Sequence, residues 1–215
     1  MPGGILFLII EIIGTAAFAI SGALAAIGGS LDIFGVVFIG CITACGGGVV
    51  RDLLIGNIPP AIFTDFFIFA VAAITSLTVF TVSYIKRKSF PGLREKTERI
   101  NNIFDAIGLA AFSVMGCEAA MEAGFSQNGF LVTFMGMLTG IGGGIMRDLL
   151  LDDTPYVLKK HVYALASILG SMAFYRIRKY HGSDVFAIGF SMGLVVALRL
   201  LATKYRWELP KIKFE

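Results

Sequence analysis

The sequence has few charged residues for its length. Only 15% of its 215 residues are Asp, Glu, Lys or Arg, whereas a soluble domain carries about 25%. The chain is instead 56% hydrophobic, with a mean hydropathy of +0.81. One soluble core cannot hide so much apolar surface. The composition therefore excludes an ordinary soluble domain and indicates a lipid bilayer as the solvent.

Side chains that bind metals are also scarce. His161 and His181 lie far in sequence from Cys41 and Cys45, and Cys117 lies in a different apolar run. A metal site or a disulfide framework needs more of these residues at closer spacing. We therefore expect the three cysteines to be small buried side chains, and we expect no metal.

Patterns typical of catalysis or of nucleic-acid binding are missing as well. No Ser, His and Asp occur at a useful spacing, and the glycine-rich stretch 46–52 lacks the Lys-Ser/Thr of a phosphate-binding loop. The net charge is only +3, and the basic residues flank apolar runs. We expect neither an enzyme nor a nucleic-acid partner, and no cofactor.

Long apolar runs fill most of the chain. A membrane-spanning helix needs roughly 20 such residues, about twice the length of a barrel strand, and these runs do not alternate polar with apolar. The sequence therefore predicts an all-α membrane protein with seven transmembrane helices, the first of them retained rather than cleaved as a signal peptide. The predicted spans are Ile5–Ile27, Ile33–Ile55, Ala61–Ile85, Ile103–Met121, Gly129–Leu151, Tyr156–Ile177 and Asp184–Leu201.

The two halves of the chain repeat one another. Residues 40–60 match residues 136–156 at ten of 21 positions, and the first span matches the fourth. Each unit holds three spans, an odd number, so the second unit enters the membrane from the opposite side. We therefore expect two inverted repeats, at 5–85 and 103–177, with a connecting loop at 86–102, a seventh helix at 184–201 and a tail at 202–215.

Each repeat carries three consecutive glycines late in its second span. A glycine inside a helix costs roughly 1 kcal/mol relative to alanine, so each triplet predicts a kinked or unwound turn at membrane depth. Two such breaks facing each other could line a polar passage. The alternative is close helix packing through small residues. The residues concerned are Gly46, Gly47, Gly48, Gly142, Gly143 and Gly144.

An Arg-Asp pair follows each glycine triplet. Charges inside a membrane are expensive, so we expect Arg51 and Asp52, and likewise Arg147 and Asp148, to face water or one another. Pairing across the repeats, Arg51 with Asp148 and Arg147 with Asp52, is one interpretation. Snorkelling of the arginines toward the interface is the other.

Further charged residues within the predicted spans include Glu11, Asp105, Glu118 and Arg199. Glu118 is deep enough in its span to face a cavity. Glu11 and Asp105 lie near the starts of their spans, where an interfacial position is expected. Arg199 lies near the end of the last span and is expected to be a snorkelling anchor.

The distribution of Lys and Arg predicts the orientation. Twelve of them lie in the connections after the third and fifth spans and in the C-terminal tail, against three on the other side. Because basic residues collect in cytoplasmic loops, we expect a multi-pass protein of the cell membrane with its C-terminus in the cytoplasm and its N-terminus outside.

Four stretches resemble a known family. "TACGGGVVRDLLIGNIPP", "DAIGLAAFSVMG", "TGIGGGIMRDLL" and "LRLLATKYRWELP" are similar to the prokaryotic trimeric intracellular cation channels, a family that also carries a glycine-transporter-like domain label. The resemblance implies a homotrimer with one pore per protomer. It further implies that the pore passes through the first six helices and is bounded by glycine kinks in the second and fifth.

The resemblance also implies a function. It predicts a channel for monovalent cations, chiefly K⁺, with K⁺ or Na⁺ as permeant ions and with membrane lipid as a further partner. A secondary transporter for a small zwitterion such as glycine is the alternative, because broken helices in inverted repeats serve either purpose. A purely structural membrane protein is a third interpretation. The candidate polar residues that line or gate the pore are Thr43, Thr139, Arg51, Asp52, Arg147, Asp148 and Glu118.

Overall fold

The computed structural model describes residues 4–86, 93–159 and 162–207. These residues are helical apart from short turns, and no strand occurs among them, so the predicted all-α fold is confirmed. The elements are α1 (Gly4–Gly28), α2 (Ile33–Ile55), α3 (Ala61–Thr64), α4 (Phe66–Lys86), α5 (Leu93–Ala120), the π-helical turn η1 (Met121–Phe125), α6 (Gly129–Leu150), α7 (Tyr156–Lys159), α8 (Val162–His181) and α9 (Asp184–Tyr205).

Six helices of the described chain are long and apolar enough to cross a membrane: α1, α2, α4, α5, α6 and α9. The helix α8 has 20 residues but falls outside this set. Its last turn contains Arg178, Lys179 and His181, which dilute its apolar character. The composition of the helices therefore gives one span fewer than the seven predicted.

Each half of the chain has the same order of elements. Two long helices are followed by a short one and then by another long one: α1, α2, α3 and α4 in the first half, and α5, α6, α7 and α8 in the second. The short helices lie where a single long span was expected, because the chain turns at extended Asp65 before α4 begins. The helix α5 begins at Leu93 and so includes part of the polar stretch that was expected as a connection.

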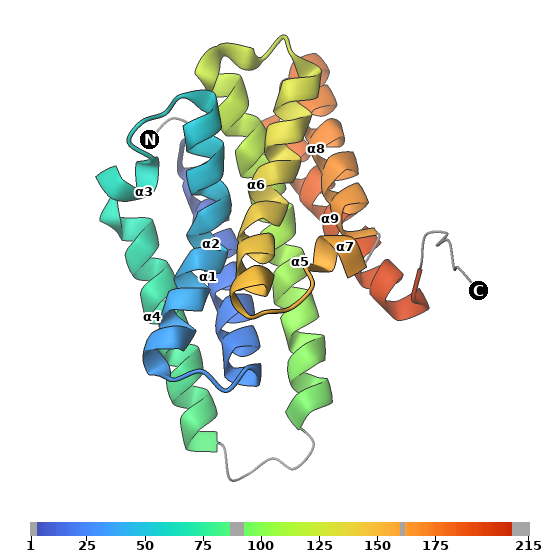
Figure 1. The fold of residues 1–215 in the computed structure, drawn as a ribbon. Coiled ribbons are helices and arrows are strands. Elements are labelled where there is room, and N and C mark those ends of the chain that lie inside the picture. The colour runs from blue at the N-terminus through green and yellow to red at the C-terminus, as the bar shows by residue number, and fades with distance from the viewer. Residues whose placement is uncertain (1–3, 87–92, 160–161, 208–215) are drawn as a thin grey trace, which may run out of the picture.

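The helices α1 and α5 form the centre of the bundle. They pack against each other, α1 also contacts α2 and α4, and α5 also contacts α6, α8 and α9. Small residues allow the central contact: a Cβ added at Gly14 would lie 2.7 Å from the Cβ of Ala111. The rings of Phe18 and Phe112 stack at 5.3 Å beside it. Figure 1 shows α1, α2 and α4 on one side of α5 and α6, and α8 and α9 on the other.

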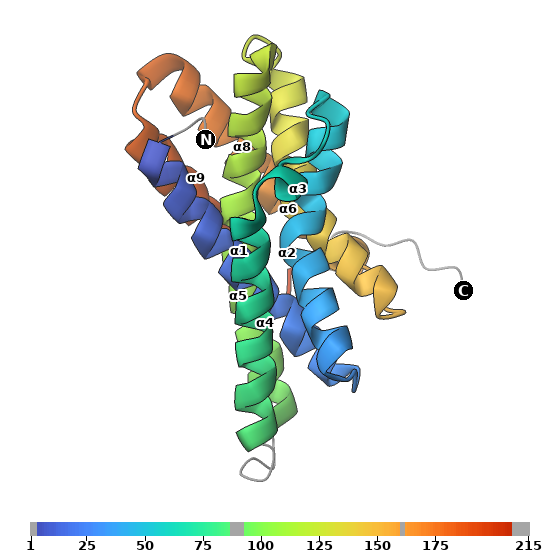
Figure 2. The same ribbon diagram turned by 90° about the vertical axis from the view of Figure 1, so that its left-hand side faces the viewer.

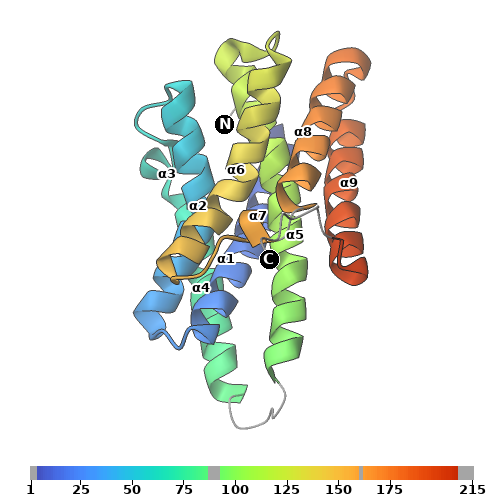
Figure 3. The same cartoon turned by 45° about the vertical axis from the view of Figure 1, so that its right-hand side comes forward.

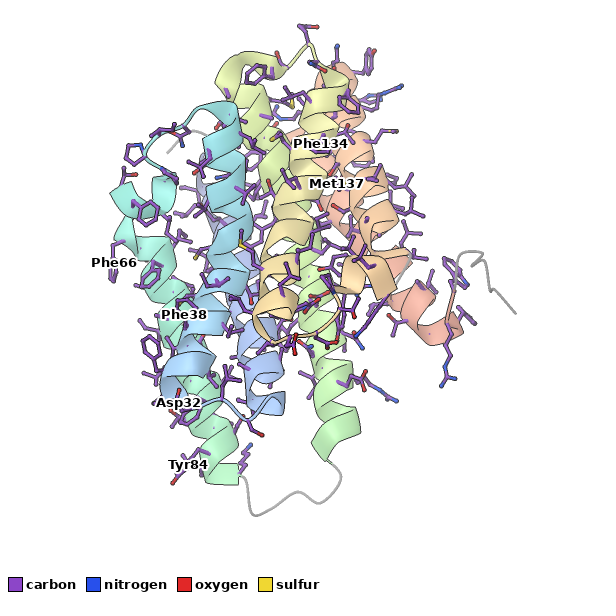
Figure 4. All side chains as sticks on the ribbon, in the orientation of Figure 1. Asp32, Phe38, Phe66, Tyr84, Phe134 and Met137 are labelled. Atoms are coloured by element: carbon purple, nitrogen blue, oxygen red, sulfur yellow. The ribbon has the colours of Figure 1, made fainter. Side chains whose placement is uncertain are left out.

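The outer faces of the bundle are apolar. The helix α4 is the least buried of the six candidate spans and runs along the outside of α1, as Figure 2 shows. Phe38, Phe66 and Tyr84 lie on this flank in Figure 4, and the side chain of Phe66 is 70% exposed. On the opposite flank α8 and α9 lie side by side (Figure 3). Such surfaces fit contact with lipid or with other copies of the chain.

Candidate functional site

The helices α2 and α6 cross at the two glycine triplets. A Cβ added at Gly47 would lie 2.2 Å from the carbonyl oxygen of Thr139, and one added at Gly143 would lie 1.9 Å from the carbonyl oxygen of Thr43. These two glycines therefore let the backbones of two helices touch. The hydroxyl groups of Thr43 and Thr139 are turned away from this contact and donate to backbone oxygens of their own helices, each at 2.6 Å.

Of the two alternatives predicted at the triplets, the unwound turn is wrong, and the kink stays a prediction. Both α2 and α6 are uninterrupted α-helices through their glycines, with no residue of non-helical backbone in either. The packing alternative accounts for Gly47 and Gly143, because backbone contact replaces the stabilisation that larger side chains would supply.

The remaining glycines face other surroundings. Gly46 faces the sulfur of Met146, and Gly142 faces the Cα of Gly47. Gly48 meets nothing closer than 3.8 Å and lines a cavity, whereas Gly144 lies beneath the hydroxyl of Tyr163. The three glycines of each triplet point in different directions around their helix, so each of them faces a different neighbour.

The Arg-Asp pair fixes a turn after each crossing helix. In the first half the Nε of Arg51 donates to Oδ1 of Asp52 at 2.8 Å, and the backbone N–H of Ala61 donates to Oδ2 at 2.9 Å. The carboxylate thereby holds the first residue of α3 against the end of α2. The charge on Arg51 offsets the charge that this buried carboxylate brings.

The second half repeats this arrangement. The Nε of Arg147 donates to Oδ1 of Asp148, and the N–H of Tyr156, the first residue of α7, donates to Oδ2, both at 2.8 Å. The expected pairing across the repeats is therefore wrong. Each arginine pairs with the aspartate that follows it in sequence. The backbone N–H of the next short helix holds the same carboxylate in place.

A cavity of about 760 Å³ opens at one end of the bundle. It is enclosed by α1, α2, α3, α4, α5 and η1, at the end where α3 lies in Figure 1. We call it the vestibule. Its charged lining residues are Glu11, Arg51, Asp52, Asp65, Glu118 and Glu122. Five acids against one base give it a negative character, and its apolar wall reaches Ala44, Cys45 and Gly48 of α2 beside the helix crossing.

The opposite half of the bundle instead contains buried, paired Asp and Arg side chains. The Nη1 of Arg147 donates to Ser21 at 2.7 Å and to Asp105 at 3.0 Å. The Nη2 of Arg199 also donates to Asp105, at 3.3 Å, as does the hydroxyl of Tyr163. We call Asp105, Arg147, Asp148 and Arg199 the ion-pair cluster. All four are at most 5% exposed, so these charges are buried between the helices and paired with one another.

The cluster corrects two expectations. Asp105 is fully buried rather than interfacial, and Arg199 is 2% exposed rather than snorkelling. The guanidinium of Arg199 lies 4.4 Å from the ring centroid of Tyr163, which holds it in place. Two oppositely charged residues in different apolar spans were a signal that each could be the partner of the other.

The two halves differ in whether the arginine also pairs with the acid in the first helix of its own repeat. The repeat aligns Glu11 with Asp105 and Arg51 with Arg147. Arg147 contacts Asp105, whereas Glu11 forms no ion pair in the part of the chain described and lines the vestibule together with Arg51. The aligned acid and arginine are therefore paired in the second half, whereas in the first half they line a cavity without forming an ion pair.

The five charged residues predicted from the sequence divide between these two places, whereas Thr43 and Thr139 lie at the helix crossing. Arg51, Asp52 and Glu118 line the vestibule, as expected for Glu118. Arg147 and Asp148 belong to the ion-pair cluster. Sequence reasoning missed Ser21 and Asn101, whose mutual hydrogen bond of 2.7 Å extends the cluster, because single hydroxyl and amide groups are common in helices.

The fold and these two sites define a class of protein: a multi-pass helical membrane protein with a polar cavity at one end and buried ion pairs at the other. The family model described as glycine transporter matches residues 8–84 and 102–179. The membrane protein YvgT of Bacillus subtilis is 35% identical over 207 residues, covering 96% of each chain. The inner membrane protein YadS of Escherichia coli is 34% identical over 93% of this chain and 92% of its own.

Solved structures give the same result. A prokaryotic TRIC channel crystallised in 0.5 M KCl is 31% identical, with a TM-score of 0.83 over 95% of this chain and 98% of its own. A TRIC cation channel solved to explain conductance is 34% identical, with a TM-score of 0.82 over 98% and 99%. The trimeric intracellular cation channel orthologue from Rhodobacter sphaeroides, at 28% identity, has a TM-score of 0.84 over 94% and 99%.

The chain therefore belongs to the TRIC family, whose bacterial relatives include the UPF0126 membrane proteins. The solved members are channels rather than enzymes, so this chain is assigned no catalytic activity.

Proposed function

We propose that the protein is a channel for monovalent cations, chiefly K⁺, with one pore in each protomer. The observation that carries this proposal is the vestibule, an acid-lined cavity that reaches the glycine crossing of α2 and α6. Carboxylates attract cations into a cavity with low-dielectric walls. The similarity to solved TRIC cation channels supports the same function. No resident cofactor is needed, since the permeant ion is the ligand.

The pore runs from the vestibule past Gly48 toward the ion-pair cluster. Arg51, Asp52 and Glu118 line its wide end, and Arg147 and Asp148 form its gate together with Asp105. The hydrogen bonds of Arg147 to Asp105 and Ser21 support the proposal that this conformation is the closed one. Opening requires Arg147 to release Asp105 while it keeps Asp148, which leaves the α6–α7 turn intact.

The glycine crossing is the pivot of this change. Helices whose backbones touch at Gly47 and Gly143 can rotate about the contact without moving large side chains. Thr43 and Thr139 sit at the pivot, where their carbonyl groups face the opposite helix. The glycines therefore act in gating through close packing, not through a broken helix.

A glycine transporter is the alternative function. A cavity open at one end and sealed at the other also fits one state of an alternating-access carrier. Proteoliposomes discriminate the two. A channel releases K⁺ down its gradient at a rate that rises with concentration and takes up no glycine, whereas a carrier takes up labelled glycine with saturation. Saturable glycine uptake without K⁺ release would remove the channel proposal.

The proposed topology has seven spans, with α8 as the sixth to cross the membrane. The order of the helices supports this, because α8 takes the place of α4 in the second half, as the predicted inverted repeat would require. The gate then lies toward the cytoplasm and the vestibule faces outside, in the cell membrane. The trimeric state of the Rhodobacter sphaeroides orthologue supports a homotrimer with lipid around it.

Reporter fusions test the topology. A reporter that is active only in the cytoplasm, fused after residue 207, is expected to be active, and a reporter active only outside the cytoplasm is expected to be silent there. The same pair fused in the 181–184 turn is expected to give the opposite result. Equal behaviour at both positions would mean that α9 does not cross the membrane.

A further inference from the structure

An arginine outside the vestibule contacts one of its acids. Arg178 belongs to α8, which contributes no residue to the vestibule lining. Its Nη2 donates to Oε1 of Glu118 at 3.2 Å, and its Nη1 lies 2.5 Å from Oδ1 of Asp184, the first residue of α9. The guanidinium therefore joins α5, α8 and α9 at the mouth of the cavity.

Glu118 uses only half of its carboxylate in this contact. Its side chain is 9% exposed and lines the vestibule, and Oε2 is buried with no hydrogen-bond partner among the described residues. A buried carboxylate oxygen is costly to leave unpaired unless water or a cation reaches it. The carboxylate is thus shared between a guanidinium on one side and the cavity on the other.

The vestibule holds few other positive charges. Arg51 is the one basic residue among the lining residues that the structure describes, and Asp52 already pairs with it at 2.8 Å. The guanidinium of Arg178, which lies outside the cavity wall, therefore offsets the negative charge of Glu118. Arg178 contacts both carboxylates at once, Glu118 at 3.2 Å and Asp184 more closely at 2.5 Å, so it would keep one acidic partner on releasing Glu118.

We propose that Arg178 sets the conductance of the channel by competing with entering cations for Glu118. This inference rests on the proposed channel function. While Arg178 pairs with Glu118, the vestibule attracts cations less strongly. When the guanidinium moves to Asp184 alone, Glu118 becomes a full cation-binding carboxylate facing the cavity. The ion pair between Arg178 of α8 and Glu118 of α5 thereby regulates cation entry.

The effect has a distinct dependence on salt. One unit charge near the entrance changes the local cation concentration by about two- to fivefold in dilute salt, where the Debye length is about 30 Å at 0.01 M. At 1 M the Debye length is about 3 Å, so the charge is screened. A purely structural role for Arg178 would not produce this salt dependence.

Single-channel recording of purified variants in planar bilayers tests the proposal. Arg178→Gln is expected to raise the K⁺ conductance about two- to fivefold at 0.01 M KCl and to leave it unchanged at 1 M. Arg178→Lys keeps the charge and is expected to conduct like the unsubstituted protein. Arg176→Gln is the matched control, with the same charge change on the same helix. Arg176 lines a separate groove between α6 and α8 and does not contact Glu118, so the rise in conductance at 0.01 M KCl is expected to be clearly smaller than for Arg178→Gln.

Glu118→Gln provides a second, independent variant. It is expected to lower the conductance about two- to fivefold at 0.01 M KCl and not at 1 M, and it decides the matter if Arg178→Gln fails to fold. Equal conductance of Arg178→Gln and Arg176→Gln at 0.01 M, or an unchanged Glu118→Gln, would overturn the proposal and leave the channel function standing. Absence of current from the unsubstituted protein would overturn the channel function itself.

Discussion

Alanine at position 143 is expected to lower the melting temperature of the purified protein by about 2–12 °C. Its Cβ would lie 1.9 Å from the carbonyl oxygen of Thr43, and a backbone atom cannot move aside as a side chain can. Overpacking costs about 1–3 kcal/mol, and each kcal/mol shifts the melting temperature by about 2–4 °C at this chain length. Heating in detergent followed by size-exclusion chromatography measures the loss.

The neighbouring triplet supplies the control. Gly48→Ala is the same change late in a crossing helix, but the new Cβ would meet nothing closer than 3.8 Å. Alanine is about 1 kcal/mol more favourable than glycine in a helix, so the melting temperature is expected to stay the same or rise. Equal losses for Gly143→Ala and Gly48→Ala would contradict the assignment of the crossing to Gly143.

Replacing Asp105 with asparagine is expected to destabilise the protein by about 3–5 kcal/mol. The carboxylate accepts from Arg147, Arg199 and Tyr163 and is fully buried, so its loss leaves two buried guanidinium groups with too little negative charge. Thermal unfolding in detergent measures the change, and the same variant is expected to spend more time open in bilayer recordings.

The corresponding acid of the first half gives the comparison. Glu11→Gln removes a carboxylate that lines the vestibule and forms no ion pair among the described residues. It is expected to cost less than about 1 kcal/mol, as for groups that remain in contact with water. A loss as large as that of Asp105→Asn would mean that the two halves hold their acids in the same way.

The sequence predicted the helices well because apolar runs of this length allow few other structures. The α-helices follow the same order of long and short elements in both halves, as a repeat requires, and the inverted arrangement of the two halves stays a prediction. The short helix α3 was missed as a separate element, because the single residue Asp65 between it and α4 barely changes the hydropathy of the run.

The contacts of the charged residues were harder to predict. The sequence indicated that Arg51 and Arg147 need partners. Spacing along a helix did not reveal that each arginine pairs with the aspartate next to it in sequence. That geometry depends on the N–H of Ala61 and of Tyr156, which come from the following turn. Glycine propensity predicted a broken helix, yet contact between two backbones overrode it.

The central claim is that the vestibule and the gate belong to a passive cation pore. Recording from the purified, unsubstituted protein in a planar bilayer with a KCl gradient tests it most directly. The account predicts discrete current steps that reverse near the K⁺ equilibrium potential. A silent bilayer, with protein from the same preparation taking up glycine with saturation in proteoliposomes, would contradict it.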